Sequence, residues 1–354
     1  QPEAPVWEAV QETKEQVIRL LKNSPLLYGS YQSLNAEWRQ RFLDFCQGKK
    51  SLPLTYDPFF KRIFHPDVHP DRLSRLVSSI LGIHVRVLHI LPSEDTMMDG
   101  ASLLIMDLLG ELEDGSLVNI EIQKQGYAFP AERISCYSSD LVMRQYARVK
   151  GSRGRAFTYQ DIRKVYVIVL SEKSPNIFHK IHHAYLHHGK TWFDTGLEME
   201  LLQEYFFIAL DVFRKFPYPK EKDELTAWLS LLVTENLDEA KRLIQDYPWL
   251  QEIYEEIAML RRRPEEVLGM FSEALRILDQ NTVKYMIEEL QKQLEEKTAV
   301  IREKDAERAA AIREKDAERA AAIREKDAER AAVIKEKDAE IAELKKKLEA
   351  AYPG

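Results

Sequence analysis

The chain has little cysteine and no long apolar run. Its 354 residues include two cysteines, Cys46 and Cys136, which are too few for a disulfide framework and lack the spacing of metal ligands. The sequence contains no signal-peptide pattern and no run of about 18 apolar residues. These absences argue against a secreted or membrane-spanning protein. They predict a cytoplasmic protein with no membrane partner.

Basic residues are also outnumbered by acidic residues over the whole chain. The chain has 51 Lys and Arg residues against 58 Asp and Glu residues, for a net charge of −7. This balance argues against a phosphate-rich partner, because nucleic acids are bound largely through basic side chains. Residues 124–155 reverse the sign, with seven basic residues against two acids, a net charge of +5. The basic residues are Lys124, Arg133, Arg144, Arg148, Lys150, Arg153 and Arg155.

Helical and extended patterns are mixed along the chain, which predicts an α/β fold with a mixed sheet flanked by helices. A hydrophobic content of 45% is sufficient for a proper core. Residues 55–64 and 72–82 are expected to be helical, the second segment ending at Gly82. A longer helix is expected over 130–149. The expected strands cover residues 85–91, 101–113, 117–123, 164–170 and 204–213.

Composition divides the chain into four parts. Residues 1–50 are expected to form an N-terminal helical extension of two amphipathic helices, the second capped by Asn35. Residues 51–219 contain the predicted sheet. Residues 220–292 are rich in helix formers and are expected to form a helical subdomain, and residues 293–354 a helical, coiled-coil-like tail.

The tail repeats an eleven-residue unit. The sequence "IREKDAERAAA" starts at residues 301 and 312, followed by "IREKDAERAAV" at 323 and "IKEKDAEIAEL" at 334. This period gives about 3.67 residues per turn, as in straight or slightly right-handed coiled coils. Each full repeat offers one isoleucine followed by alanines, so two interpretations stay open. The tail is either a solvated single helix that acts as a spacer or a coiled coil that joins copies of the chain in a homo-oligomer.

The stretch "MDLLGELEDGSLVNIEIQ", residues 106–123, is predicted to form a β-hairpin. A three-residue loop of Glu113, Asp114 and Gly115, with Gly115 left-handed, segregates the apolar side chains onto one face. A two-residue loop would mix the faces. The favoured register places Asp107 opposite Glu121.

Opposed strand residues have Cα atoms about 4.5–5.5 Å apart, so these two carboxylates would repel each other unless a cation lay between them. A hard divalent ion such as Mg²⁺ suits such oxygen ligands. The alternative is an exposed acidic strand face at the edge of a sheet, and spacing does not decide between the two.

Three motifs together resemble the PD-(D/E)XK nuclease superfamily, and more narrowly the Rpn-like recombination-promoting nucleases, also described as PD-(D/E)XK nuclease family transposases. The motifs are "DPFFKRIF", "MDLLGELEDGSLVNIEIQ" and "ERISCYSSDLVMRQYARV", and the resemblance covers roughly residues 50–290. It implies a restriction-endonuclease-like fold built on a mixed sheet. It also implies that the protein binds and cuts DNA.

The resemblance also implies roles for individual residues. Asp107 and Glu121 become ligands of Mg²⁺, or alternatively of Mn²⁺, together with the backbone carbonyl of Ile122. Asp57 becomes a further acid of the site. Gln123 takes the position of the superfamily's lysine, and its amide can orient a water molecule but cannot accept a proton from it at neutral pH.

The predicted helix after the hairpin carries a repeated basic and aromatic pattern. Arg133, Tyr137, Arg144 and Arg148 are spaced by 4, 7 and 4 residues, which places them along one helix face. We expect the arginines to contact DNA phosphates, with Tyr137 and Gln145 supporting the site. The alternative is a solvated helix with Tyr137 partly buried in the core.

A second candidate metal site lies in a histidine-rich segment. His179, His183 and His187 follow each other at intervals of four, a spacing that could hold zinc on a helix. Neither a HExxH glutamate nor cysteine partners accompany them. A polar surface helix or loop is therefore the preferred interpretation.

Taken together, these features predict an Mg²⁺-dependent deoxyribonuclease of the transposition and recombination type, which hydrolyses phosphodiester bonds. Gln123 and the long repeat motivate an alternative of another class. In that alternative the chain is a catalytically weak DNA-binding or scaffolding protein that assembles through its C-terminal helix.

Overall fold

A mixed sheet forms the centre of the protein. The computed structural model describes residues 12–91, 108–124, 131–216 and 222–351. Six strands lie in the order β1-β2-β3-β4-β6-β5. Their bounds are β1 Val87–Leu91, β2 Leu108–Leu112, β3 Leu117–Gln123, β4 Val165–Ser171, β5 Leu186–Lys190 and β6 Gln203–Ala209. The three strands β3, β4 and β6 run parallel, while β1, β2 and β5 pair antiparallel with their neighbours.

The parallel strands end together. Gln123, Ser171 and Ala209 are aligned across β3, β4 and β6. We call this end of the sheet the carboxyl edge. Ligand sites of open parallel sheets commonly lie beyond the carboxyl ends of the strands, because backbone groups and loops converge there.

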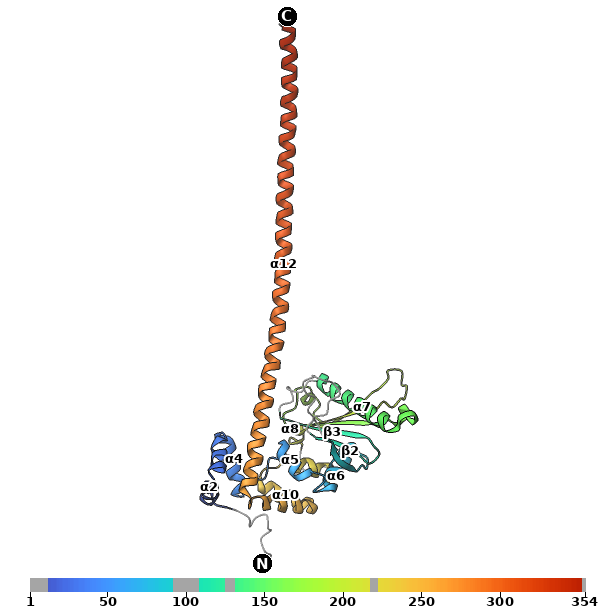
Figure 1. Cartoon of the computed structure of the whole chain (residues 1–354), viewed down its shortest axis with the longest axis vertical. Helices are drawn as coiled ribbons and strands as arrows, with labels where there is room; N and C mark the ends of the chain where they lie inside the picture. Colours follow the sequence, from blue (N-terminus) through green and yellow to red (C-terminus); the bar gives the residue numbers. More distant parts are fainter. Residues whose placement is uncertain (1–11, 92–107, 125–130, 217–221, 352–354) are drawn as a thin grey trace, which may run out of the picture. The chain divides into compact units, whose positions relative to one another are not determined.

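Helices cover both faces of the sheet, as Figure 1 shows for α7 on one side and α5 and α6 on the other. On the α7 face, Tyr137 and Leu141 pack against Val165 and Val167 of β4. The other face belongs to a larger core. This arrangement confirms the predicted mixed sheet flanked by helices. The helices are α2 Lys14–Lys22, α3 Pro25–Ser33, α4 Ala36–Cys46, α5 Asp57–Phe64, α6 Pro70–Leu81, α7 Ala131–Arg153, α8 Leu210–Phe213, α9 Glu224–Val233, α10 Leu237–Asp246, α11 Gln251–Leu260 and α12 Pro264–Ala351.

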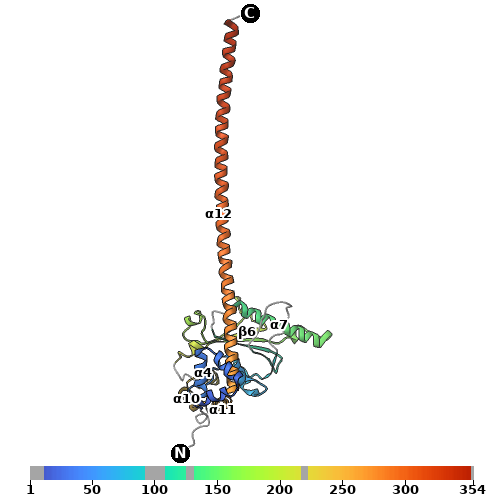
Figure 2. The same ribbon diagram turned by 60° about the vertical axis from the view of Figure 1, so that its left-hand side comes forward.

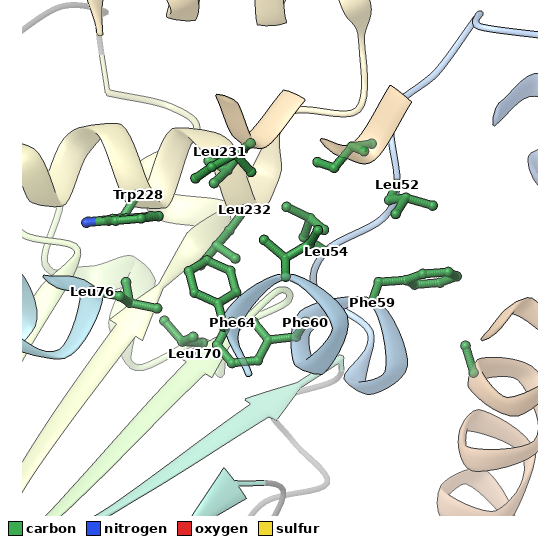
Figure 3. Packing of buried hydrophobic residues seen from close by; sticks show 14 of the residues in the cluster. Leu52, Leu54, Phe59, Phe60, Phe64, Leu76, Leu170, Trp228, Leu231 and Leu232 are labelled. Carbon is green, nitrogen blue, oxygen red and sulfur yellow. The ribbon is translucent and has the colours of Figure 1, made fainter. Parts of the chain in front are cut away.

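The larger core is built around the aromatic residues of α5. Phe60 and Phe64 stack with ring centroids 4.5 Å apart, and Phe64 lies 5.5 Å from the ring of Trp228 in α9. Figure 3 shows these rings together with Leu170 of β4. A phenylalanine every fourth residue places these side chains on one helix face, so burial of that face fixes α5 against the sheet.

The N-terminal helices belong to the same core. Trp38 and Phe42 of α4 contact Phe271 of α12 at 5.8 Å between ring centroids, and α4 lies beside the start of α12 in both ribbon views (Figure 2). The chain forms two compact units, residues 1–280 and 281–354. The division between the units falls within α12.

Two local predictions differ from the structure. The described part of the N-terminal segment contains the three helices α2, α3 and α4 instead of two. Ser24 caps a new helix that starts at Pro25, a residue that favours the first helical position. The cap at Asn35 was predicted, and its side chain accepts a hydrogen bond from the Trp38 backbone at 3.0 Å. The last predicted strand ends at Ala209, where the short helix α8 begins.

The first turns of α12 are buried, whereas its repeat region is exposed. Val267, Leu268, Phe271 and Ala274 belong to the larger core. The isoleucine that opens each repeat is 53–60% exposed at residues 301, 312, 323 and 334. Within the described residues, no helix combines the length and apolar character needed to cross a bilayer.

Candidate functional site

The hairpin turn has the predicted geometry. The Leu112 backbone N–H donates to Ser116 at 2.8 Å, and the Gly115 N–H donates to Leu112 at 2.9 Å. Gly115 has a φ of +85°, which a residue with a Cβ adopts only with strain. Leu108 pairs with Ile120 and Glu111 with Leu117, so the predicted register is confirmed along the described strands. Asp107, the first predicted metal ligand, lies outside the described residues.

The face of β3 towards α7 carries a buried polar row. Asn119 is fully buried and Glu121 is 1% exposed. Asn119 Nδ2 donates to Glu121 Oε1 at 2.9 Å, and the half-buried Gln123 Nε2 donates to Glu121 Oε2 at 3.4 Å. Because β3 lies between β2 and β4, the alternative of an exposed acidic face at a sheet edge is wrong. A carboxylate enclosed by two amides lies near the carboxyl edge.

The donor chemistry of this row fits a hard divalent cation. Asn119 Oδ1 is buried and has no hydrogen-bond partner in the described structure. With the Glu121 carboxylate and the backbone carbonyl of Ile122 it makes a set of oxygen donors, the kind that Mg²⁺ and Mn²⁺ prefer. Among the described residues, no group of three or more His, Cys, Asp or Glu side chains could hold a metal ion.

Lys124, next to Gln123, joins the carboxyl edge to the segment that precedes α5. Its Nζ donates to Thr55 Oγ1 at 2.7 Å and to Glu172, and lies 3.2 Å from the Tyr56 ring centroid. Burial lowers the pKa of Lys124 to about 8, although Glu172 acts in the opposite direction. This contact fixes the start of α5 beside the ends of β3 and β4. In the sequence, Lys124 stands out only as one of the seven basic residues of segment 124–155.

Asp57 lies at the first position of α5. Its carboxylate pairs with Lys61, one helical turn later, at 2.9 Å. Burial raises the pKa of Asp57, partly offset by the positive charge of Lys61. The observed geometry gives Asp57 a local helical ion pair, and its role as a further acid of the site stays a prediction.

Two of the predicted DNA contacts lie near the beginning of α7. Arg133 Nε donates to Tyr137 Oη at 2.7 Å, and the guanidinium carbon lies 5.3 Å from the Tyr137 ring centroid. Tyr137 is fully buried against the sheet. Its hydroxyl therefore positions the Arg133 guanidinium, while its ring packs in the core between α7 and the sheet.

The other predicted contacts have internal partners. Arg144 pairs with Asp140 at 2.6 Å, and Arg148 makes two hydrogen bonds to Glu111, at 2.6 and 2.9 Å. Gln145 is 1% exposed, donates to the Gly115 carbonyl at 3.3 Å and accepts from the Arg163 backbone. Glu121 lies five positions beyond Ser116, the residue after the turn, and an extended strand of that length spans about 17 Å. Gln145 therefore fastens α7 to the turn end of the sheet and does not lie beside Glu121.

The histidines do not converge on a metal. His179 contacts Asp211 at 3.1 Å, whereas His188 lies on β5 and contacts Glu204 at 2.8 Å. Ser174 Oγ also approaches His179, at 3.2 Å, but through the same Nε2 atom that faces Asp211. A Ser-His-Asp catalytic triad needs the serine and the aspartate on opposite ring nitrogens. This cluster therefore joins the loop after β4 to the short helix α8 without forming a triad. His187 and His188 lie on β5, a strand that was not among those expected from the sequence.

A comparison with models of known families found a match. The model of the PD-(D/E)XK nuclease family transposases matches residues 54–289. Searches of curated proteins and of solved structures found no match. The family match covers most of the chain, from the segment before α5 into α12. The chain therefore belongs to the PD-(D/E)XK nuclease family transposases.

Proposed function

We propose that the protein is a metal-dependent DNA endonuclease that acts in transposition or recombination. The observation that carries this proposal is Glu121, a buried carboxylate held between two carboxamides near the carboxyl edge of the sheet. Burying a charge is costly unless it is paired or coordinates a cation, so this arrangement favours a role for the carboxylate in binding. The family membership supports a nuclease-like function for it.

In this proposal Asp107, Glu121 and the Ile122 carbonyl hold Mg²⁺ or Mn²⁺. When bound, such an ion neutralises phosphate charge and makes a coordinated water more acidic. Gln123 orients the attacking water through its amide, which cannot remove a proton. Water adds to the phosphorus, the bond to the 3′ oxygen breaks, and that oxygen takes up a proton, leaving a 3′ hydroxyl and a 5′ phosphate.

Arg133 is the predicted DNA contact best placed for this chemistry. It lies near the start of α7, with its guanidinium positioned by the buried Tyr137. Phosphate contacts of this kind fix the register of a nucleic acid without reading its sequence. We assign Arg144, Gln145 and Arg148 to the internal structure of α7, because each has an internal partner.

Plasmid cleavage tests the proposal. Purified protein with Mg²⁺ or Mn²⁺ should nick or linearise supercoiled plasmid, and Asp107→Ala should remove this activity. Asp194→Ala changes an exposed acid elsewhere in the chain and serves as the matched control. Cleavage that survives Asp107→Ala in a clean preparation would contradict the assignment.

Replacing the amide with the superfamily's residue tests the role of Gln123. Positioned proton transfer contributes typically 10²–10⁴-fold to a rate, so an amide at this position should limit the chemistry. Gln123→Lys is expected to raise the cleavage rate by about tenfold or more. A rate that stays the same or falls, in a folded variant, would show that the amide is not the limiting feature.

A second candidate function is a catalytically weak DNA-binding or scaffolding protein that assembles through α12. Gln123 and the exposed isoleucines of the repeat favour this alternative. Calorimetric titration with Mn²⁺ discriminates between the two candidates. Absence of divalent binding together with retained DNA binding would support the scaffold, whereas binding that is lost in Glu121→Ala would support the nuclease.

A further inference from the structure

A cluster of three aromatic rings lies at the end of α7. Tyr146 of α7 and Tyr159 of the following 3₁₀ turn are nearly parallel, with centroids 6.2 Å apart and an interplanar angle of 12°. Phe157 packs edge-on against both, at 5.5 Å from each. Tyr159 is 78% exposed. Most of its ring surface is therefore open to solvent, although the ring is held in a defined stack.

The loop that carries Tyr159 is held by its own hydrogen bonds. The Thr158 backbone donates to Asp161 at 2.8 Å, and the Thr158 hydroxyl donates to the same carboxylate at 3.2 Å. Arg153, at the end of α7, pairs with Asp161 at 2.8 Å. These contacts order the loop before any ligand arrives, so little conformational entropy is lost when a flat group stacks on the ring.

Lys150 lies against the rings, and Arg155 stands two residues before Phe157 in the chain. Lys150 Nζ donates to Tyr146 Oη at 2.6 Å and lies 5.0 Å from its ring centroid. Lys150 and Arg155 are exposed, and no acidic side chain of the described residues pairs with either of them. Arg148 and Arg153 are already paired with acids. We call Tyr146, Lys150, Arg155, Phe157 and Tyr159 the aromatic platform.

We propose that the aromatic platform binds single-stranded nucleic acid, with a base stacked on Tyr159 and backbone phosphates beside Lys150 and Arg155. Exposed aromatic rings interleaved with unpaired cations match the alternation of base and phosphate in a single strand. A duplex fits less well, because its base faces are already stacked.

The platform is separate from the candidate catalytic site. Tyr146 lies thirteen positions after Arg133 on α7, about 20 Å along the helix. The inference rests on the proposed function in that it takes the nuclease's own substrate as the bound polymer. In that case the platform holds a strand that extends away from the cleavage site and adds affinity without taking part in the reaction.

Binding without catalysis tests the platform. Fluorescence anisotropy of a labelled single-stranded DNA, with EDTA present, measures the affinity of the full chain in the absence of cleavage. Tyr159→Ala should weaken binding by at least about fivefold, the lower range for losing one stacked base. Tyr159→Phe keeps the ring and should bind like wild type. Trp192→Ala removes another aromatic side chain, 77% exposed, as the matched control.

The salt dependence tests the cations. Replacing both Lys150 and Arg155 with glutamine should reduce the slope of log affinity against log salt by about 1.4, since each single-strand phosphate contact contributes roughly 0.7. The double substitution of Lys14 and Arg19, two exposed basic residues of α2, is the matched control and should leave the slope unchanged.

Several outcomes would overturn the platform. These are wild-type affinity in Tyr159→Ala, equal losses for single-stranded and duplex DNA, or a wild type that binds no single strand. A Tyr159→Ala variant with altered mass in light scattering would assign the surface to a second copy instead. The same titration with single-stranded RNA shows whether ribose or deoxyribose is preferred. Weaker binding of either RNA or DNA by Tyr159→Ala supports the platform. Plasmid cleavage that persists in Tyr159→Ala leaves the nuclease proposal intact, and single-strand binding by a protein that cuts nothing supports the platform alone.

Discussion

Glu121 illustrates how neighbouring residues can define a site that no single residue indicates. Its carboxylate accepts hydrogen bonds from Asn119 and Gln123, which precede and follow it on the same strand face. Alternation along a strand places every second side chain on one face, so this row could have been found in "NIEIQ". From the sequence, Glu121 and Gln123 were predicted to be site residues, whereas Asn119 on the same strand face was not.

Removing the Asn119 carboxamide should weaken divalent binding. Groups that orient metal ligands typically contribute 10–100-fold to affinity. We therefore expect Asn119→Ala to weaken Mn²⁺ binding by about tenfold, measured by calorimetry below the melting transition of the variant. Equal affinities in Asn119→Ala and wild type would show that the hydrogen bond to Glu121 has no part in binding the ion.

At the scale of elements, the sequence predicted what depends on local patterns. The hairpin register follows from the alternation of apolar residues and from a turn that needs Gly115. The cap at Asn35 and the left-handed Gly82 are equally local, and both are observed. The role of Gln145 could not be predicted in this way. Its partners are backbone groups of Gly115 and Arg163, 30 and 18 residues away, and only the tertiary fold brings them together.

A charged network joins α5 and α6 to α11. Glu256 of α11 accepts from Arg62 of α5 at 2.9 Å and from Arg72 of α6 at 2.5 Å, and contacts His69 at 2.9 Å. Burial alone would raise the pKa of Glu256, but the hydrogen bonds from Arg72 and His69 outweigh it and lower the pKa below 4.5. A depressed carboxyl pKa stabilises the fold above the unfolded value and loses this contribution as the pH falls.

Glu256→Gln should therefore destabilise the protein in a pH-dependent manner. Hydrogen bonds to charged groups contribute about 1.5–3 kcal/mol each at best, so we expect a loss of about 1–3 kcal/mol in the free energy of unfolding at neutral pH. The difference from wild type should shrink as the pH falls through the lowered pKa of Glu256, because the wild-type carboxyl group is then protonated and uncharged, as the amide is. Urea unfolding at a series of pH values measures it.

Glu252→Gln is the matched control for this network. Glu252 lies on the same helix, and its carboxylate is 3.5 Å from Arg72, but its side chain is 84% exposed. Removing its charge should therefore change the free energy of unfolding little. A Glu256→Gln variant as stable as Glu252→Gln at neutral pH would contradict the assignment.

At the scale of the whole molecule, large apolar residues of α12 that are exposed to solvent form a continuous stripe. Ile287, Leu294 and Ile301 follow each other at intervals of seven, and intervals of eleven then connect Ile301, Ile312, Ile323 and Ile334. Seven residues fall about 20° short of two helical turns, and eleven exceed three turns by about 20°. The two drifts compensate each other. The stripe therefore keeps to one side of the helix, as a helix with a partner requires.

We predict that this stripe drives self-association. Light scattering should report a smaller number of chains per particle for a variant that ends near residue 295 than for the full chain. Ile312→Glu with Ile323→Glu should have the same effect as truncation, because charge on the stripe opposes its burial. Ala310→Glu with Ala321→Glu adds the same charge on the opposite side of the helix and should not. Equal particle sizes for the full and truncated chains would leave α12 as a spacer.

The central claim is that the buried carboxylate near the carboxyl edge belongs to a nuclease site. Its most direct test is plasmid cleavage with Mg²⁺ by wild type, by Glu121→Gln and by Glu113→Gln, an exposed acid of the same hairpin. We predict cleavage by wild type and by Glu113→Gln, and a loss of at least about 10²-fold in Glu121→Gln with its DNA affinity retained. Cleavage by a folded Glu121→Gln variant at the wild-type rate would contradict the account.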